Sequence, residues 1–240
     1  MIDALLHGKF SRNQENMEDI LTSNVFGILK YNSDRRPLLQ FLSKATSTNG
    51  QPPFSTFPDS AEIHFEFWPW LNDIAGGCEP DVLLRIKYVG RQNYLVLIEA
   101  KLWSGKSSLA KPPSHFDNNS DALVVDQLAR EWRCLKALAD SEKTDPILIY
   151  LTADTICPTD DILASHNALS SCSGETGRIF WLSWRYLPSI LDQFPESTMF
   201  VDLAKSLRYL DLVFFEGFSS FGSYDFEWMY VPGKPNDFRA

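Results

Sequence analysis

The stretch from Glu79 to Lys106 constrains the fold most, because it places charged residues at the ends of two apolar segments. Residues 93–100 are mostly apolar and β-branched or aromatic, which predicts a buried strand. Glu99 closes this segment and Lys101 follows two positions later, so both side chains project from the same face. Charged groups beside a core are costly unless they are paired or bind a metal. The sequence therefore predicts an ion pair or a metal site at this strand end.

A helix is predicted from about Glu15 to Tyr31, because apolar residues recur along it at helical spacing. At roughly 100° per residue, Glu18 projects inside the apolar arc, between Val25 and Leu29, whereas Asp19 points the opposite way. Glu18 is thus the acid of this helix expected to face the interior, where it needs a partner. The alternative is a carboxylate at the edge of the helix that caps its first turn.

The following segments predict an α/β core in the element order α-β-β-β-α-β. The pattern gives a short helix at 36–45, strands at 61–70, 81–88 and 94–102, a helix at 121–139 and a strand at 146–152, with loops at 46–60 and 104–121 and a turn at Gly76–Gly77. The first three strands have short links, which predicts an antiparallel meander. The strand that follows the second long helix is expected to join the sheet by a crossover connection.

The C-terminal part predicts an extension of this core rather than a second domain. The pattern gives an irregular, polar stretch that can contain short helical turns at 153–177, a strand at 178–183, helices at 184–193 and 199–216, and an extended aromatic tail at 217–240. No repeat or linker interrupts the chain. We therefore expect a single domain at 1–240, with a core at about 15–185 and a helical and aromatic extension at 186–240.

Several classes of protein are disfavoured by features that the sequence lacks. The four cysteines are scattered without a CxxC pair, so neither a disulfide framework nor a zinc site is expected. The apolar runs are too short to span a bilayer, and we expect a cytoplasmic protein with no membrane partner. Neither a GxSxG nor a GxxxxGK[ST] motif occurs, which disfavours a serine hydrolase and a P-loop enzyme.

The distribution of charge along the chain favours an anionic substrate, although the net charge of the protein does not. A net charge of −9 disfavours non-specific binding of nucleic acid. Between Val82 and Phe116, however, six basic residues stand against one acid, Glu99. Positive charge beside the acidic strand ends is what a phosphate-containing substrate requires, and a solvated basic face is the alternative.

The residue types at the strand ends suit the hydrolysis of phosphodiester bonds. This reaction needs a nucleophilic water and positive charge at the attacked phosphate. Mg²⁺ accepts oxygen ligands and is usually held by one or two carboxylates, which Asp81 and Glu99 on adjacent strands could supply. Lys101 shares the face of Glu99 and could orient the water or stabilise developing negative charge. A purely structural Glu99–Lys101 ion pair is the alternative.

Pro80-Asp81 followed by Glu99-Ala100-Lys101, in this element order, resembles the PD-(D/E)xK nuclease superfamily over residues 15–185. The resemblance implies a restriction-endonuclease-like αβββαβ core with a central mixed sheet flanked by helices. It implies a metal site formed by Asp81, Glu99 and the backbone carbonyl of Ala100, in which Glu18 binds the metal or supports a residue that does.

The helix after the motif matches this superfamily less well. Gln127 lies at the margin of its apolar stripe and corresponds to a glutamine that related nucleases carry, so we count it among the candidate catalytic residues. Those nucleases have a tyrosine four residues later. Here that position is Glu131, which lies nearer the middle of the stripe and is a further acid that could approach the site, and the next aromatic residue is Trp132.

The resulting hypothesis is a nuclease that depends on Mg²⁺, for which Mn²⁺ can substitute. Its expected substrate is nucleic acid, with DNA favoured over RNA, although no residue chooses between them. Members of the superfamily commonly dimerise, and a homodimer is therefore one expectation. The alternative function is a catalytically silent nuclease-like module that binds nucleic acid or a partner protein.

Overall fold

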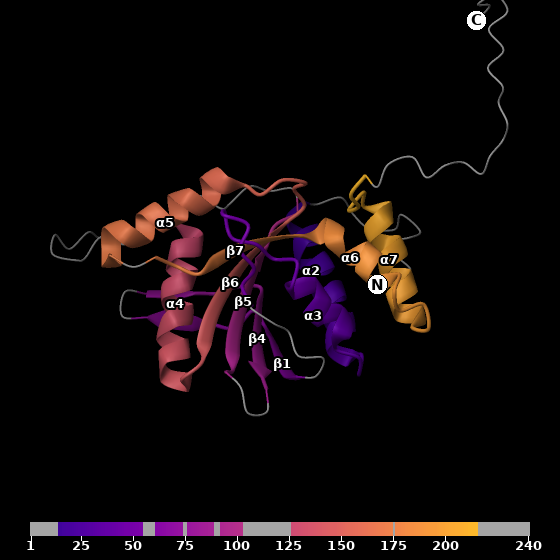
Figure 1. Ribbon diagram of the computed structural model, residues 1–240, viewed down its shortest axis with the longest axis horizontal. Helices are drawn as coiled ribbons and strands as arrows, with labels where there is room; N and C mark the ends of the chain where they lie inside the picture. Colours follow the sequence, from indigo (N-terminus) through magenta and orange to yellow (C-terminus); the bar gives the residue numbers. More distant parts are fainter. Residues whose placement is uncertain are drawn as a thin grey trace, which may run out of the picture.

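The computed structural model describes residues 14–54, 61–73, 76–88, 92–102, 126–174 and 176–215. In these residues, helices pack on both faces of a mixed five-stranded sheet with the order β1-β4-β5-β6-β7 (Figure 1). The strands are β1 (Glu62–Phe67), β2 (Leu71–Asp73), β3 (Gly76–Cys78), β4 (Val82–Lys87), β5 (Tyr94–Ala100), β6 (Asp145–Thr152) and β7 (Ile179–Ser183). The helices are α2 (Gln14–Tyr31), α3 (Arg36–Leu42), α4 (Gln127–Glu142), α5 (Thr159–Ser173), α6 (Leu187–Leu191) and α7 (Thr198–Tyr209). The α/β class predicted from the sequence is confirmed.

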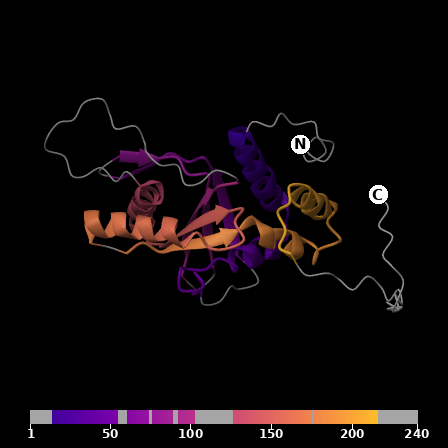
Figure 2. The same ribbon diagram turned by 90° about the horizontal axis from the view of Figure 1, so that it is seen from above.

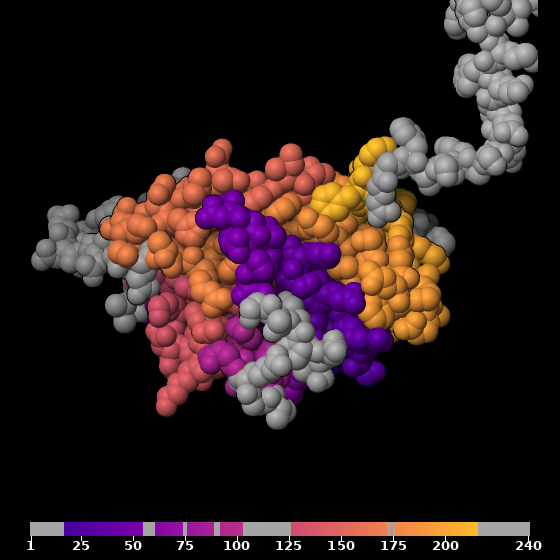
Figure 3. Space-filling model, in the orientation of Figure 1, coloured from indigo at the N-terminus to yellow at the C-terminus, as the bar shows by residue number. Residues whose placement is uncertain are grey.

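The two faces of the sheet carry separate hydrophobic clusters, because alternate side chains of a strand point to opposite faces. Val82 and Leu84 of β4 pack with α2, α3, α6 and α7, whereas Leu83 between them packs with α4 and α5. Figure 2 shows α4 and α5 on one side of the sheet and α2 and α7 on the other. Figure 3 shows α2 and α3, in indigo, beside α6 and α7, in orange and yellow. A site at the end of the sheet can therefore receive side chains from both helix layers.

The topology brings the start of β4 beside the ends of β5 and β6. Strands β1, β4 and β5 pair antiparallel, while β5, β6 and β7 pair parallel. The antiparallel meander and the crossover to β6 through α4 are thus confirmed. Val82 lies opposite Ile98, and Ala100 lies beside Leu151. Residues that precede β4 and residues that end β5 consequently meet at one edge of the sheet.

The turn predicted at Gly76–Gly77 is wrong. These glycines begin β3, which pairs antiparallel with β2 to form a small β2–β3 ribbon between β1 and β4. Strands of three residues are too short to show an alternating pattern, and glycine is depleted in strands. The ribbon is held instead by packing, since Leu71 and Cys78 are buried against α4.

The irregular stretch predicted at 153–177 is also wrong over most of its length. Helix α5 occupies Thr159–Ser173. Asp160 and Asp161 lie in its first turn, where negative charge stabilises a helix by interacting with the positive end of its dipole. It ends at Gly174, whose φ of 67° provides the left-handed residue that terminates many helices. The helix contains four serines and one asparagine, and the burial of Ile162 and Leu169 against α4 stabilises it.

The ends of several predicted helices are displaced. Asp126 has extended backbone and caps α4 by accepting a hydrogen bond from the Ala129 N–H, so the predicted start at 121 is too early. Helix α3 ends at Leu42, before the predicted 45, and α7 ends at Tyr209, before the predicted 216. The polar loop predicted at 104–121 and the aromatic tail at 217–240 lie outside the described residues. None of the helices in the described part is long and apolar enough to cross a membrane.

We predict that Phe26→Ala lowers the free energy of unfolding by about 3–5 kcal/mol, because it leaves a cavity in the larger cluster. Phe26 is fully buried, and its ring centroid lies 6.0 Å from that of Trp184. Urea denaturation monitored by circular dichroism measures the change. Tyr31→Ala, in the same helix but 80% exposed, is the control and should shift stability by no more than about 0.5 kcal/mol. Equal effects of the two substitutions would contradict the assignment of the core.

Candidate active site

The residues singled out in the PD and ExK segments lie at one end of the sheet. Asp81 immediately precedes β4, Glu99 lies in β5, and Lys101 follows β5. Side chains along β5 point alternately to the face covered by α2 and to the face covered by α4. Glu99 stands two residues after Leu97, which packs with α4, so Glu99 also points toward α4. Lys101 is fixed at the strand end by its N–H, which donates to the carbonyl oxygen of Leu151 over 2.7 Å. The three side chains are all buried.

Lys101 joins two carboxylates that come from different elements. Its Nζ lies 2.8 Å from Oε1 of Glu99 and 3.1 Å from Oε1 of Glu18. The other oxygen of Glu18 accepts a hydrogen bond from the Leu102 N–H over 2.9 Å. The Glu18 side chain is only 15% exposed, whereas Asp19 is exposed, so the orientation predicted from the helix phase is confirmed. Helix α2 is thereby tied to the end of β5.

Asp81 is held by the backbone of the neighbouring strand. Its Oδ2 accepts a hydrogen bond from the Ala100 N–H over 2.8 Å, and its carbonyl oxygen accepts one from the Trp68 N–H over 3.0 Å. Burial, followed by the nearby charge of Glu99, raises the pKa of Asp81 to about 7, although the Ala100 hydrogen bond acts in the opposite direction. Without a cation, this carboxyl is therefore partly protonated near neutral pH.

Helix α4 brings Gln127 and Glu131 to the same acids. The side-chain N–H groups of Gln127 donate to Oε1 of Glu99 over 2.5 Å and to Oε1 of Glu131 over 3.0 Å. Glu131 is 1% exposed, and burial together with the charge of Glu99 raises its pKa well above the ordinary value. Glu131 is thus a fourth acid, which contacts the site through Gln127.

The site is rich in negative charge for a buried place. In the described residues, four carboxyl groups (Glu18, Asp81, Glu99 and Glu131) surround the single ammonium of Lys101, an excess of three negative charges if all ionise. Burial raises the pKa of Glu99 as well. Burial alone would lower the pKa of Lys101, but Glu99 and Glu18 more than offset this and leave its pKa raised. Protons or additional cations are therefore needed to balance the charge.

The oxygen atoms of these side chains are the kind that a hard divalent cation binds, although in the described residues the acids are not arranged around a metal position. Among the described residues, no three or more His, Cys, Asp or Glu side chains are arranged to hold a metal ion as they stand. The ammonium of Lys101 lies between Glu18 and Glu99 instead. Oε1 of Gln127 and Oε2 of Glu131 are buried without a hydrogen-bond partner in that part of the chain. All these ligands are oxygens, which Mg²⁺ and Mn²⁺ prefer, so the residues fit such an ion.

An open cavity gives access to Lys101 from the carboxyl ends of β5 and β6. Its volume is about 520 Å³, and its lining includes Lys101, Tyr150, Thr152, Asp154, Asp161 and Arg185. Ligands of open α/β sheets commonly bind beyond the carboxyl ends of the strands. Arg185 shapes one wall, since its guanidinium donates to the carbonyl oxygens of Ala153, Asp211 and Val213. The cavity is large enough for a nucleotide-sized group.

The basic residues of the 82–116 region are only partly associated with the site. Arg85 pairs with Glu66 at 2.7 Å and with Glu142 at 2.9 Å, and Lys87 stands at the far end of β4 opposite Glu62. The alternative of a solvated basic face thus fits the exposed Lys87, whereas Arg85 is half-buried in ion pairs and Lys101 lies in the site. Arg91, Lys106 and Lys111 lie outside the described residues.

Two tryptophans that the sequence did not single out also contact the site. The indole N–H of Trp184 donates to the carbonyl oxygen of Lys101 over 3.3 Å, and Trp68 is bonded to Asp81 as described. Trp184 has no local signal, because its partner lies 83 residues away. Trp68 belongs to a Trp-Pro-Trp sequence at the end of β1, which is the one cue that an alternating strand pattern ends there.

Comparisons of the chain with protein-family models, with curated proteins and with solved structures give no match. A functional assignment therefore has to be argued from the chemistry of the site.

We predict that, in EDTA, the protein is more stable at pH 5.5 than at pH 8. The pKa of Asp81 is about 7 in the folded state and ordinarily 3.8, as in the unfolded chain, so the folded state binds more protons between these values. Stability then falls as pH rises through this window, by about 2 kcal/mol from Asp81 alone between the two pH values. Glu99 and Glu131 act in the same direction, whereas Lys101 titrates above the window.

Urea denaturation at the two pH values, with Asp81→Asn beside the wild type, measures this effect. The substitution should reduce the pH dependence. Asp34→Asn is the control, because the hydrogen bond from Arg36 lowers the pKa of Asp34, which stays ionised throughout the window. An undiminished pH dependence in Asp81→Asn would show that another group carries it.

Proposed function

We propose that the chain is a divalent-metal-dependent nuclease with a restriction-endonuclease-like core of the PD-(D/E)xK type. The observation that carries the proposal is the meeting of Asp81, Glu99 and Lys101 at one sheet end, where acids from helices on both faces join them. The order α2-β1-β4-β5-α4-β6, apart from helix α3 after α2 and the inserted β2–β3 ribbon, supports the αβββαβ core.

Asp81, Glu99 and the carbonyl oxygen of Ala100 would hold the ion, with Glu18 beside them. When bound, Mg²⁺ supplies charge that polarises the phosphate and lowers the pKa of a bound water. The N–H of Ala100 already fixes one oxygen of Asp81, so this carboxylate is oriented before any ligand enters. Because a metal binds the ionised carboxylate, the proton that Asp81 holds near pH 7 competes with it.

Lys101 acts through its charge in this proposal. Its raised pKa keeps the ammonium protonated near neutral pH, which excludes it as a general base there. A buried ammonium at the wall of the cavity instead stabilises negative charge that develops on the attacked phosphate. Gln127 positions Glu99 by donating to its Oε1, and it also holds Glu131 near the site.

The substrate is nucleic acid, with DNA favoured over RNA. The cavity that Lys101 helps to line has room for a nucleotide-sized group next to this lysine. A structural ion pair would account for Glu99 and Lys101 but not for the burial of Asp81 and Glu131 at the same place. Each additional buried acid is unfavourable for stability, and such groups are concentrated at functional sites.

We predict that the purified protein cuts DNA in the presence of Mg²⁺ or Mn²⁺ and that EDTA abolishes the cutting. Asp81→Asn and Glu99→Gln should each lower the rate by at least about 100-fold, because each removes negative charge that holds the ion. Single-turnover cleavage of labelled DNA, followed on gels, measures the rate. Glu142→Gln is the control, since Glu142 lies at the other end of α4 and pairs with Arg85. Full activity of both site variants would contradict the assignment.

Metal binding separates a nuclease from a module that only holds nucleic acid. We predict that titration calorimetry with Mn²⁺ detects binding by the wild type and no binding by Glu99→Gln. Lys101→Met should retain Mn²⁺ binding but lose cleavage, because it removes the stabilising charge and keeps the carboxylates. A protein that binds DNA without any Mn²⁺ binding would be the silent module instead.

A further inference from the structure

The connection between β1 and β2 exposes two large aromatic side chains next to the proposed site. It consists of Trp68, Pro69 and Trp70, and the two tryptophans are 40% and 64% exposed. Exposed single apolar residues are ordinary, but a pair of indoles at the edge of a buried acidic site is not. The contacts of their backbone and rings show whether these two side chains are held in fixed positions.

Trp68 is held directly opposite Asp81. The antiparallel ladder pairs Phe67 with Val82, and it continues by one residue through the bond from the Trp68 N–H to the Asp81 carbonyl oxygen. Trp68 has a φ of 48°, in the left-handed region that bulky residues rarely adopt. Such backbone costs about 1–3 kcal/mol and concentrates at functional sites. The left-handed residue redirects the chain at the point where its own N–H is hydrogen-bonded to the residue that carries the site acid.

Trp70 is fixed on the β2–β3 ribbon. Its indole N–H donates to Oδ1 of Asn72 over 2.9 Å. Its ring lies against Gly77, where an added Cβ would stand only 2.6 Å from ring carbon Cζ2. Glycine at this position thus lets the ring rest on the ribbon, while its exposure leaves other ring surface open. The ribbon is anchored to α4 by the ion pair between Asp73 and Arg133 at 3.0 Å.

We propose that Trp68 and Trp70 stack on unpaired bases of the strand that is cut, so that the substrate is single-stranded or locally melted DNA. This inference rests on the proposed function and defines its substrate class. Bases offer a π-face to a protein side chain only where they are unstacked, and base–aromatic stacking contributes about 1–3 kcal/mol per base. Indoles that are already fixed lose little conformational entropy on binding.

The position of the pair favours a nucleic acid strand over a protein partner. The Cα atoms of Trp68 and Trp70 are at most about 7 Å apart, so both indoles can contact neighbouring nucleotides. A strand bound at Asp81 would pass over Trp68, which is joined to it by a backbone hydrogen bond. Nearby, Nζ of Lys30 lies 5.5 Å from the centroid of the Phe67 ring, and that ring lies 5.7 Å from Trp68. The connection therefore combines aromatic rings with a cation, as surfaces that bind single strands do.

Fluorescence anisotropy in EDTA tests the proposal without requiring cleavage. The probes are a fluorescein-labelled oligo-dT strand and a blunt duplex of the same length. Trp68→Ala and Trp70→Ala should each weaken binding of the single strand by at least about fivefold, as the loss of one stacked base requires. Trp70→Phe should retain most of the affinity, since it keeps a ring. Thermal melting followed by circular dichroism shows whether each variant is folded, and Trp68→Leu, which also lacks a ring, replaces Trp68→Ala if the latter is not.

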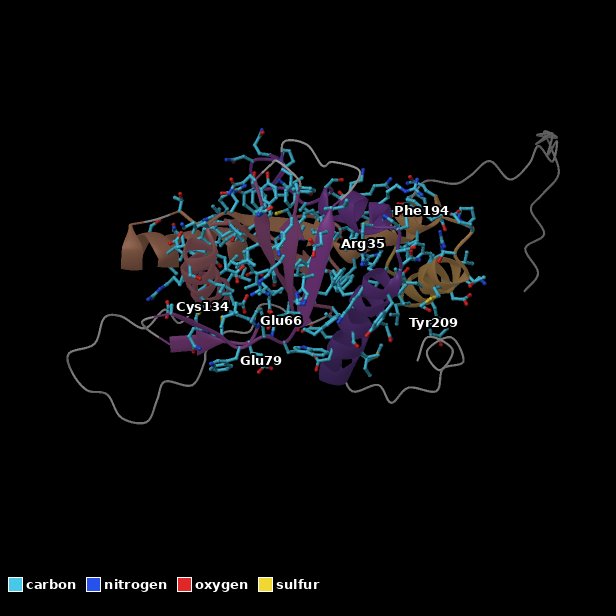
Figure 4. All side chains as sticks on the ribbon, turned by 90° about the horizontal axis from the view of Figure 1, so that it is seen from below. Arg35, Glu66, Glu79, Cys134, Phe194 and Tyr209 are labelled. Atoms are coloured by element: carbon cyan, nitrogen blue, oxygen red, sulfur yellow. The ribbon has the colours of Figure 1, made fainter. Side chains whose placement is uncertain are left out.

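Tyr209→Ala is the matched control. Tyr209 is 59% exposed on α7, and Figure 4 shows it beside α7, apart from Glu79, which follows the ribbon. The control should bind the single strand as the wild type does.

Three results would overturn the proposal. The tryptophan variants could bind the single strand like the wild type, they could lose single strand and duplex equally, or the pair could mediate self-association in sedimentation without binding DNA. Failure of the nuclease hypothesis gives a different pattern, in which single strands bind through the tryptophans but Mg²⁺ supports no cutting.

Discussion

The buried ammonium of Lys101 between Glu99 and Glu18 is the interaction on which the end of the sheet depends. It joins β5 to α2, and the second oxygen of Glu18 strengthens the junction by accepting from the Leu102 N–H. The carbonyl oxygen of Lys101 accepts from Trp184, which joins the same point to the turn before α6. Truncating Lys101 would leave buried carboxylates without their counter-charge, which is the costly way to break such a pair.

Stability alone does not account for the number of acids around this lysine. One carboxylate would satisfy Lys101, yet Asp81 and Glu131 are buried at the same place with raised pKa values. The side-chain amide of Gln127 donates hydrogen bonds to Glu99 and Glu131, while its Oε1 has no hydrogen-bond partner among the described residues. A fold selected for stability would replace these groups with apolar ones. Their presence indicates a requirement for negative charge at this place. The binding of a divalent cation would impose such a requirement.

The sequence predicted those parts of the fold and site that depend on long, regular patterns. The apolar run before Glu99 identified β5, and the helical phase of α2 identified Glu18 as the inward acid. Short or polar elements were missed, because packing rather than pattern determines them: the β2–β3 ribbon is held by Leu71 against α4, and α5 by Ile162. The contacts of Trp68 and Trp184 with the site could not be predicted either, since they depend on a left-handed backbone residue and on a bond across 83 residues.

An acidic protein that binds DNA needs attraction from sources other than its net charge. The chain carries a charge of −9, and the described arginine nearest the motif in sequence, Arg85, is neutralised by Glu66 and Glu142. In the proposed nuclease, a bound divalent ion offsets the acids at the site, and stacking on Trp68 and Trp70 supplies affinity that salt screens little. Binding would then depend less on ionic strength than it does in proteins whose affinity comes from many phosphate contacts. Positive charge at the reacting phosphate and aromatic rings against the neighbouring bases would thus each supply attraction that the net charge of the protein does not provide.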